Sequence, residues 1–164
     1  MIKTLVIIRH AKAEPQQQEQ KDFDRNLTDR GRKDAATMAG RLKDAGILPE
    51  LILSSTASRT RQTSSIIAAA TGYAESCIQA EGKLYNSSSD TIEHMLMNIP
   101  ASINTCYLVA HNPGVSQYVY EAQKTLFIGD MPTAAVVVLR FEADDWQDLP
   151  LVKKQLVLFN HPQL

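Results

Sequence analysis

Short apolar runs alternate with longer amphipathic stretches along the chain, and this pattern predicts a fold of strands and helices. Two runs, at residues 4–8 and 106–110, are almost entirely apolar, as is typical of strands that are covered on both faces. A shorter run at 51–53 predicts a third strand, and 76–79 predicts a weak one. Strands that alternate with helices indicate βαβ units and a mostly parallel sheet with helices on both faces.

Four stretches have the spacing of helices. The first follows Thr28, a good N-cap, and Gly46 can end it; Gly72 can end the second. The chain closes with two β-rich runs, which suggest a hairpin around Trp146. The length of 164 residues favours a single domain over 1–164. The predicted helices span residues 29–45, 58–71, 90–98 and 114 to about 124, and the closing strands span 134–141 and 155–159.

Composition excludes several classes of function. A formal net charge of −1 argues against a general nucleic-acid binder, which needs a basic face. The longest stretch without charged residues, 94–120, is too polar to cross a bilayer. The apolar run before Arg9 is too short for a signal peptide. We therefore expect a cytoplasmic protein that binds neither nucleic acid nor membrane.

Cysteines and metal motifs are sparse. Cys77 and Cys106 both lie in apolar, strand-like stretches, and we expect two buried free thiols rather than a disulfide. Neither the paired Cys/His spacings of metal sites nor a phosphate-binding P-loop motif occurs in the sequence. We therefore expect no metal and no cofactor.

Polar side chains with a common chemistry follow three of the predicted strands. The first strand is followed by Arg9 and His10, the strand at 51–53 by Arg59 and a helix N-terminus, and the strand at 106–110 by His111. In parallel sheets these strand ends share one edge, where ligands bind. Arginines and a helix N-terminus bind phosphoryl oxygens, a neutral imidazole can attack phosphorus, and a second imidazole can stabilise its charge. The sequence therefore predicts a phosphate site.

Each of these residues also has an ordinary structural interpretation, and the prediction depends on their joint arrangement. A single histidine after a strand is more often structural than catalytic. Arg61 lies two helical positions from Arg59 and cannot point into the same pocket, so we expect Arg59 to bind phosphate and Arg61 to lie outside. For His94 and His161 we expect structural or surface roles.

Four motifs resemble those of the histidine phosphatase (phosphoglycerate mutase-like) superfamily and occur in its order. They are the Arg-His-Ala triplet that ends 5–11, the Arg-Asn-Leu-Thr segment of 25–31, the Ser-Thr-Ala-Ser-Arg segment of 55–63, and the Ala-His-Asn-Pro-Gly segment of 110–114. The compact length and the Leu-Tyr-Asn segment at 84–86 most resemble the SixA-type phosphohistidine phosphatases. The resemblance implies a three-layer α/β/α sandwich with a mostly parallel central sheet, phosphoglycerate mutase-like in fold.

The resemblance also implies a role for each site residue. His10 is the expected nucleophile, which becomes a phosphohistidine intermediate. Arg9 and Arg59 are expected to bind the phosphoryl oxygens, and His111 to stabilise the transferring group. Two further residues, Asn112 and Arg25, are expected to line the phosphate pocket. Activity should require neutral His10 and should therefore fall between pH 8 and pH 5.

The main departure from the family pattern concerns the general acid. Larger members place a glutamate near the position of Asn86, and an amide cannot protonate a leaving alkoxide. Glu81 and Asp24 remain open as substitutes. A phosphohistidine would suit such a site, because its leaving imidazole departs near neutral pH much more readily than an alkoxide.

These observations predict a metal-independent phosphohydrolase with a covalent phosphohistidine intermediate. Its expected partner is a phosphorylated protein, such as a histidine phosphotransfer domain, and inorganic phosphate or another oxyanion should occupy the pocket. Two alternatives stay open: a phosphomonoesterase that acts on a small phosphorylated substrate, and a catalytically silent phosphate-binding regulatory module.

Overall fold

A computed structural model describes residues 1–124 and 128–164 and places the described strands in one six-stranded sheet. The strand order is β3-β2-β4-β1-β5-β6. Neighbouring strands pair in parallel from β3 to β1, whereas β5 runs antiparallel to both β1 and β6. The mostly parallel sheet and the closing hairpin are therefore confirmed. The strands are β1 (Ile2–Arg9), β2 (Leu51–Ser55), β3 (Gln79–Glu81), β4 (Thr105–Ala110), β5 (Val136–Glu142) and β6 (Gln155–Asn160).

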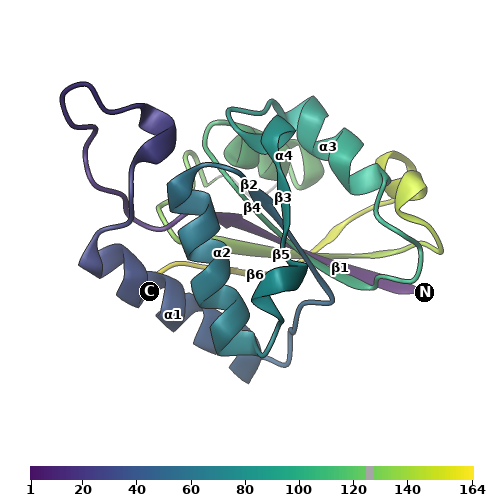
Figure 1. Cartoon of the computed structure of the whole chain (residues 1–164). Helices are drawn as coiled ribbons and strands as arrows, with labels where there is room; N and C mark the ends of the chain where they lie inside the picture. Colours follow the sequence, from purple (N-terminus) through teal and green to yellow (C-terminus); the bar gives the residue numbers. More distant parts are fainter. Residues whose placement is uncertain (125–127) are drawn as a thin grey trace.

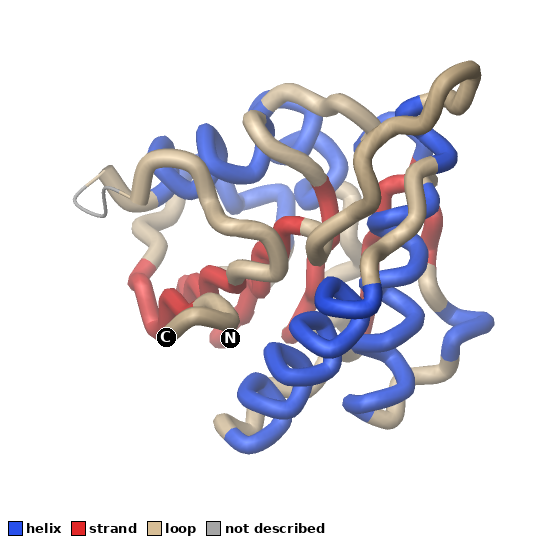
Figure 2. The backbone as a smooth tube through the Cα atoms, turned by 90° about the vertical axis from the view of Figure 1, so that its left-hand side faces the viewer, coloured by secondary structure: helices blue, strands red, loops and turns tan. Residues whose placement is uncertain are grey.

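Two pairs of helices cover the two faces of this sheet (Figure 1). Figure 2 shows the pairs on opposite sides of the strands. Each face has its own apolar cluster, the larger beneath α3 and α4 and the smaller beneath α1 and α2. The three-layer α/β/α architecture is confirmed. The helices are α1 (Asp29–Asp44), α2 (Ser58–Thr71), α3 (Ser89–Met97) and α4 (Gly114–Ala122), close to the predicted ranges.

The predicted helix signals act where expected. The Thr28 hydroxyl accepts a hydrogen bond from the Gly31 N–H at 2.9 Å and caps α1. Gly72 ends α2 in the left-handed conformation, at φ +76°. Gly31 also has a steric role, because a Cβ there would lie 2.1 Å from the carbonyl oxygen of Lys12. The first turn of α1 therefore packs directly on the backbone that follows His10.

Two expectations about the segment before β3 are wrong. Residues Glu75–Cys77 form a 3-10 turn, and the edge strand begins only at Gln79. Cys77 is exposed in this turn, whereas Cys106 is buried in β4, and both thiols are free. The apolar appearance of the segment comes mainly from Ile78, which packs against the core. One apolar side chain is enough to anchor a turn and does not require a strand.

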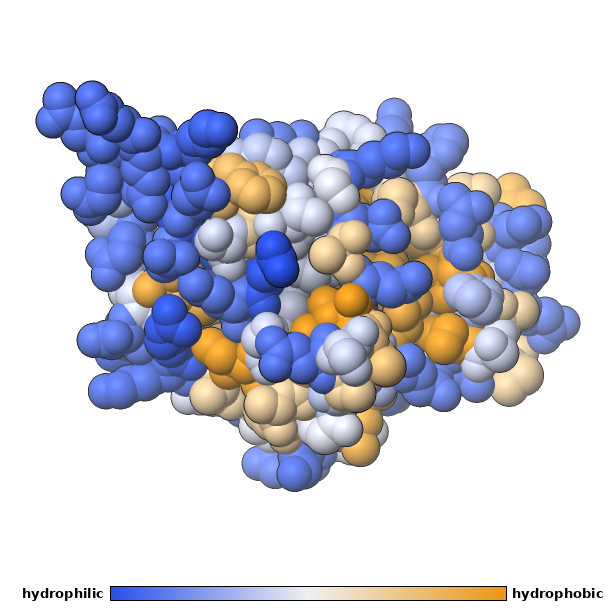
Figure 3. Space-filling view, viewed as in Figure 1, coloured by the Kyte–Doolittle hydropathy of each residue, from blue (hydrophilic) through white to orange (hydrophobic). Residues whose placement is uncertain are grey.

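Between β1 and α1, residues 12–26 form a segment that projects from the body of the protein and is largely hydrophilic on the face shown in Figure 3. A single antiparallel bridge between Ala13 and Leu27 closes its base. Near its middle lies a one-turn 3-10 helix, η1 (Asp22–Asp24), which packs against α2. None of the helices in the described residues is long and apolar enough to cross a membrane.

Candidate active site

The ends of β1 and β4 bring the two predicted histidines together. These strands pair in parallel with Arg9 opposite Ala110, so His10 and His111 leave the sheet at the same level. Their ring centroids lie 5.4 Å apart. Both side chains are buried, with His10 only 6% and His111 only 3% exposed. The register of a parallel pair therefore places two imidazoles side by side, as the sequence pattern predicts.

Arg59 joins the pair from the first turn of α2. Its side chain is buried, and its Nε–H donates to His10 Nε2 at 3.3 Å. Arg61, two positions further along the helix, is exposed. Residues two apart on a helix point in different directions, so the structure places Arg59 beside His10 and leaves Arg61 outside.

Both ring nitrogens of His10 are hydrogen-bonded, one of them as an acceptor. Its Nδ1 lies 2.8 Å from the carbonyl oxygen of Ala11, and we assign the ring proton to Nδ1 because a carbonyl can only accept. The Nε2 lone pair therefore faces the site, where it accepts from Arg59. Burial, opposed by the hydrogen bond to Ala11 and reinforced by the charges of Arg59 and Arg9, lowers the pKa of His10 from 6.5 to about 3. The ring is thus neutral at physiological pH, as a nucleophile must be.

The two ring nitrogens of His111 have different surroundings. Its Nε2 lies 2.8 Å from the Ser55 hydroxyl at the end of β2. The Ser55 hydroxyl, which also accepts from the Ala57 N–H, has one proton that it can donate to Nε2, and we assign the ring proton to Nδ1 on this basis. The Nδ1 atom is buried, and no described residue hydrogen-bonds to it. Burial lowers the pKa of His111 to about 4, which makes it a neutral hydrogen-bond donor.

Arg9 supplies a second unpaired donor. Its Nη1 donates to the carbonyl oxygen of Met131 at 2.9 Å, but its Nε is buried with no partner. Buried N–H groups in folded proteins nearly always have an acceptor. The charge of Arg9 acts on Arg59 and on both histidines, so the orphaned nitrogens of Arg9 and His111 lie in the same cluster as His10 and Arg59. The oxygens of a tetrahedral anion are acceptors that could satisfy both.

Two of the predicted phosphate-binding residues lie outside this inner cluster. Asn112 donates its amide to the carbonyl oxygen of Met131, and its side-chain oxygen accepts from Ser116, so both polar atoms are already used. Arg25 lies at the rim, where its Nη1 pairs with Asp22 at 3.0 Å. In the described part of the chain, neither side chain hydrogen-bonds to His10 or His111.

Sequence reasoning missed three polar residues of the site. Asp22 pairs with Arg59 as well as Arg25, the Tyr85 hydroxyl donates to Asp22, and Ser55 orients His111. Ser55 stands first in the recognised segment 55–63 and could have been found there. For Asp22 the sequence offers one indication, which is that it lies three residues before Arg25, a predicted site residue.

The open candidates for a general acid do not reach the cluster. Glu81 lines a separate cavity of about 220 Å³ with Leu51 and Met95. Asp24 is exposed, and its carboxylate forms no hydrogen bond or ion pair. Asn86 is exposed at φ +54° directly after Tyr85. Among the described residues there is also no group of three or more His, Cys, Asp or Glu side chains that could hold a metal ion.

Comparisons with known proteins agree with this arrangement. The family description of the histidine phosphatase superfamily (branch 1) matches residues 5–98. An uncharacterized chloroplastic protein of Arabidopsis thaliana is 31% identical over 156 residues, which cover 88% of this chain and 69% of that protein. The structure of a putative phosphohistidine phosphatase SixA from Nakamurella multipartitia superposes with a TM-score of 0.81 at 27% identity, covering 100% of this chain and 98% of that one.

A third relative extends the likeness of fold. The protein histidine phosphatase SixA complexed with tungstate has a TM-score of 0.82 at 19% identity, with coverage of 98% of this chain and 97% of that one. The sheet order, the paired histidines and the family match lead to one conclusion. The chain belongs to the histidine phosphatase superfamily (branch 1), with the phosphoglycerate mutase-like fold of its SixA-type members.

Proposed function

We propose that this protein is a phosphohydrolase that removes the phosphoryl group from phosphohistidine on a partner protein and uses His10 as its nucleophile. The observation that carries the proposal is the pair of buried, unpartnered nitrogens, Arg9 Nε and His111 Nδ1, beside a neutral His10 whose Nε2 lone pair faces Arg59. Arginine and imidazole donors together stabilise the charge of a transferring phosphoryl group, so the chemistry as proposed needs no metal.

The first step transfers the phosphoryl group to the enzyme. The His10 Nε2 lone pair forms a bond to phosphorus while the P–N bond of the substrate breaks. The bonding pair goes to the departing imidazole, whose other nitrogen already carries a proton, so the leaving group is neutral. The carbonyl oxygen of Ala11, 2.8 Å from Nδ1, stabilises the cationic ring of the phosphorylated His10. Arg9, Arg59 and His111 hold the phosphoryl oxygens throughout.

Water completes the cycle in the second step. Its oxygen attacks phosphorus, the bond to His10 Nε2 breaks, and the electron pair returns to the imidazole. Both protons of the water leave with inorganic phosphate, so His10 is regenerated in the neutral form that began the cycle. Neither step requires a proton donor for the leaving group.

The carboxylate of Asp22, which pairs with Arg59, supports a substrate of this kind. Hydrogen bonds from Tyr85, Arg25 and Arg59 lower the pKa of Asp22 far below its ordinary value. An acid that is held ionised cannot protonate a leaving alkoxide, whereas a phosphohistidine needs no such donor. The likeness to SixA structures supports the same choice. A cytoplasmic location is part of this proposal.

A comparison of leaving groups tests the proposal. Purified protein should dephosphorylate a phosphorylated histidine phosphotransfer domain rapidly, para-nitrophenyl phosphate slowly and sugar phosphates barely. His10→Asn should abolish all turnover, whereas His94→Asn, at an exposed position in α3, should retain it. Rapid sugar-phosphate hydrolysis without phosphohistidine activity would make this a small-molecule phosphomonoesterase. Oxyanion binding without turnover of any phosphorylated compound would make it a silent phosphate-binding module.

A further inference from the structure

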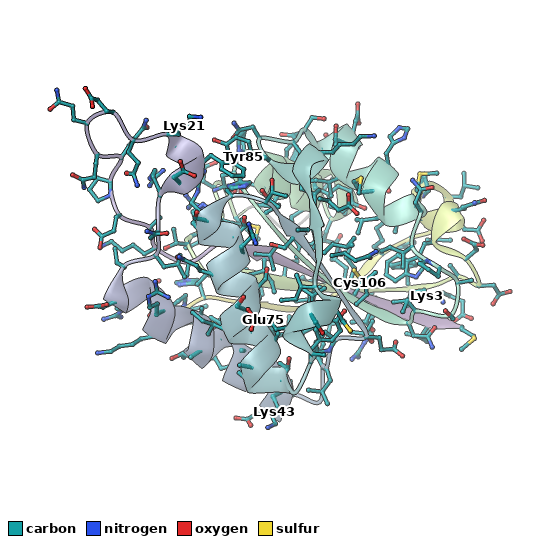
Figure 4. The ribbon with its side chains drawn as sticks, in the orientation of Figure 1. Lys3, Lys21, Lys43, Glu75, Tyr85 and Cys106 are labelled. Atoms are coloured by element: carbon teal, nitrogen blue, oxygen red, sulfur yellow. The ribbon has the colours of Figure 1, made fainter. Side chains whose placement is uncertain are left out.

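Asp22 lies at the junction between the projecting segment and the active site. Its Oδ2 accepts from the Tyr85 hydroxyl at 2.6 Å and from Arg59 Nη2 at 3.0 Å, and its Oδ1 accepts from Arg25 Nη1 at 3.0 Å. Lys21, the residue before it, and Tyr85 are labelled side by side near the top of Figure 4. Three donors from different segments therefore converge on one carboxylate at the rim of the site.

The contact with Arg59 is made at two points. Besides the carboxylate bond from Nη2, Arg59 Nη1 donates to the backbone oxygen of Asp22 at 2.9 Å. Asp22 thus engages both terminal nitrogens of the guanidinium, while Nε on the inner side donates to His10. A guanidinium is planar, so fixing its outer atoms also fixes the direction of its inner donors. Asp22 therefore determines which way Arg59 faces the phosphoryl group.

Charge gives Asp22 a second effect on the site. Arg9 and Arg59 are close enough to repel one another, and the Arg59 charge also acts on both histidines. Before a phosphoryl group arrives, the Asp22 carboxylate is the anion that Arg59 contacts. Its negative charge compensates that of the buried Arg59, while the carboxylate of Asp130 acts on Arg9.

The same carboxylate is connected to His111 through Tyr85. The Tyr85 ring lies edge-on to His111, with centroids 5.5 Å apart, and edge-on to Phe23 at 5.1 Å. The hydroxyl of this ring is the one that donates to Asp22. The position of the aromatic wall beside His111 is therefore linked to the position of Arg59.

From these contacts we propose that Asp22 is a positioning residue, which aligns Arg59 and the Tyr85 ring for the phosphoryl group without touching the reacting atoms. The proposal rests on the phosphate site proposed above and adds a residue to its support. An alternative assignment makes Asp22 only a tether that fastens the projecting segment to the body. A second alternative makes it a competitor that the phosphoryl group must displace from Arg59.

Asp22→Asn separates these cases, because the amide keeps the size of the side chain and removes its charge. The matched control is Asp24→Asn in the same turn, whose carboxylate has no partner. Tungstate affinity is measured by calorimetry, which needs no turnover and therefore tests Asp22 even if the proposed activity fails. We expect D22N to bind tungstate about 10-fold more weakly, the scale of one charge-assisted hydrogen bond, and D24N to bind it within about twofold of wild type.

Kinetics and a double variant then test the route through Arg59. In D22N kcat should fall by about 10-fold or more, and Asp22→Glu should recover part of it. In an Arg59→Ala background D22N should have almost no further effect on tungstate binding. Wild-type tungstate affinity in D22N overturns the proposal in favour of the tether, and tighter binding overturns it in favour of the competitor. If D22N does not fold, Tyr85→Phe replaces it as the test, because it deletes one donor to the Asp22 carboxylate. Tyr85→Phe should then bind tungstate more weakly than wild type, by less than the 10-fold expected for D22N. An unchanged affinity overturns the proposal.

Discussion

Acidification below pH 6.5 should destabilise the folded protein, because His10 and His111 are buried in their neutral forms. Their pKa values, about 3 and about 4, lie below the ordinary 6.5. The unfolded chain therefore takes up protons first, and the stability present above pH 6.5 is lost as the pH falls towards these values. Each ring contributes about 1.4 kcal/mol per pH unit, so both together cost about 5 kcal/mol by pH 4.5. That loss matches the whole stability of a marginal domain.

Urea unfolding at several pH values measures this loss. Trp146 is the only tryptophan and is fully buried, so its fluorescence reports the transition. Between pH 6.5 and 4.5 the free energy of unfolding of the wild type should fall. The slope should approach the value for two protons bound by the unfolded chain and not by the folded one. His10→Asn removes one titrating ring and should halve that slope, and His111→Asn should do the same. A wild-type free energy that stays constant over this range, or an unchanged slope in both variants, would refute the account of the buried rings.

The same burial corrects the pH dependence expected from the sequence. An unperturbed imidazole would protonate between pH 8 and pH 5, but burial moves the His10 pKa to about 3. Protonation of His10 in the folded protein therefore lies below pH 5 and should not limit activity above it. NMR titration of the labelled ring should show a neutral His10 at pH 5.

Three further predictions concern the site and its framework. Arg59→Lys should lower kcat/KM by about 100-fold, because lysine lacks the planar fork, while exposed Arg61→Lys should stay within about twofold; steady-state kinetics decides. Gly31→Ala should lower the free energy of unfolding by about 1–3 kcal/mol, because its Cβ would lie 2.1 Å from the Lys12 carbonyl oxygen. Gly40→Ala in the same helix has open space around the new Cβ and should raise that free energy by about 0.5–1 kcal/mol. Urea titrations measure both. Tungstate at 100 times its Kd should stabilise the protein by about 3 kcal/mol and raise Tm by about 5–10 °C in a thermal scan; an unchanged Tm would contradict the phosphate site.

The sequence predicts the centre of the site because regular structure places it. His10 and His111 follow buried strands, and a parallel register brings such positions together. Helical geometry alone separates Arg59 from Arg61, and Thr28 caps its helix as its side chain allows. In each case a periodic element converts spacing along the chain into position in space.

The rim of the site could not be predicted in this way. Asp22 lies in a hydrophilic segment without periodicity, and its partners Arg59 and Tyr85 are 37 and 63 residues away. In the segment 84–86 the sequence directs the question of a general acid to Asn86. In the structure, the residue of this segment that hydrogen-bonds to Asp22 is Tyr85. Cys77 shows the related limit that a few apolar residues anchor a turn as easily as a strand.

Trapping the phosphoenzyme tests whether His10 is the nucleophile. The protein should be incubated with a phosphohistidine donor, quenched without acid, digested and analysed by mass spectrometry. We expect a labile phosphoryl group on His10 of the wild type. It should be absent from His10→Asn, and its amount should be smaller when His111 is replaced. A phosphoryl group on another residue, or rapid turnover with no modification of His10 at any time, would contradict this role of His10.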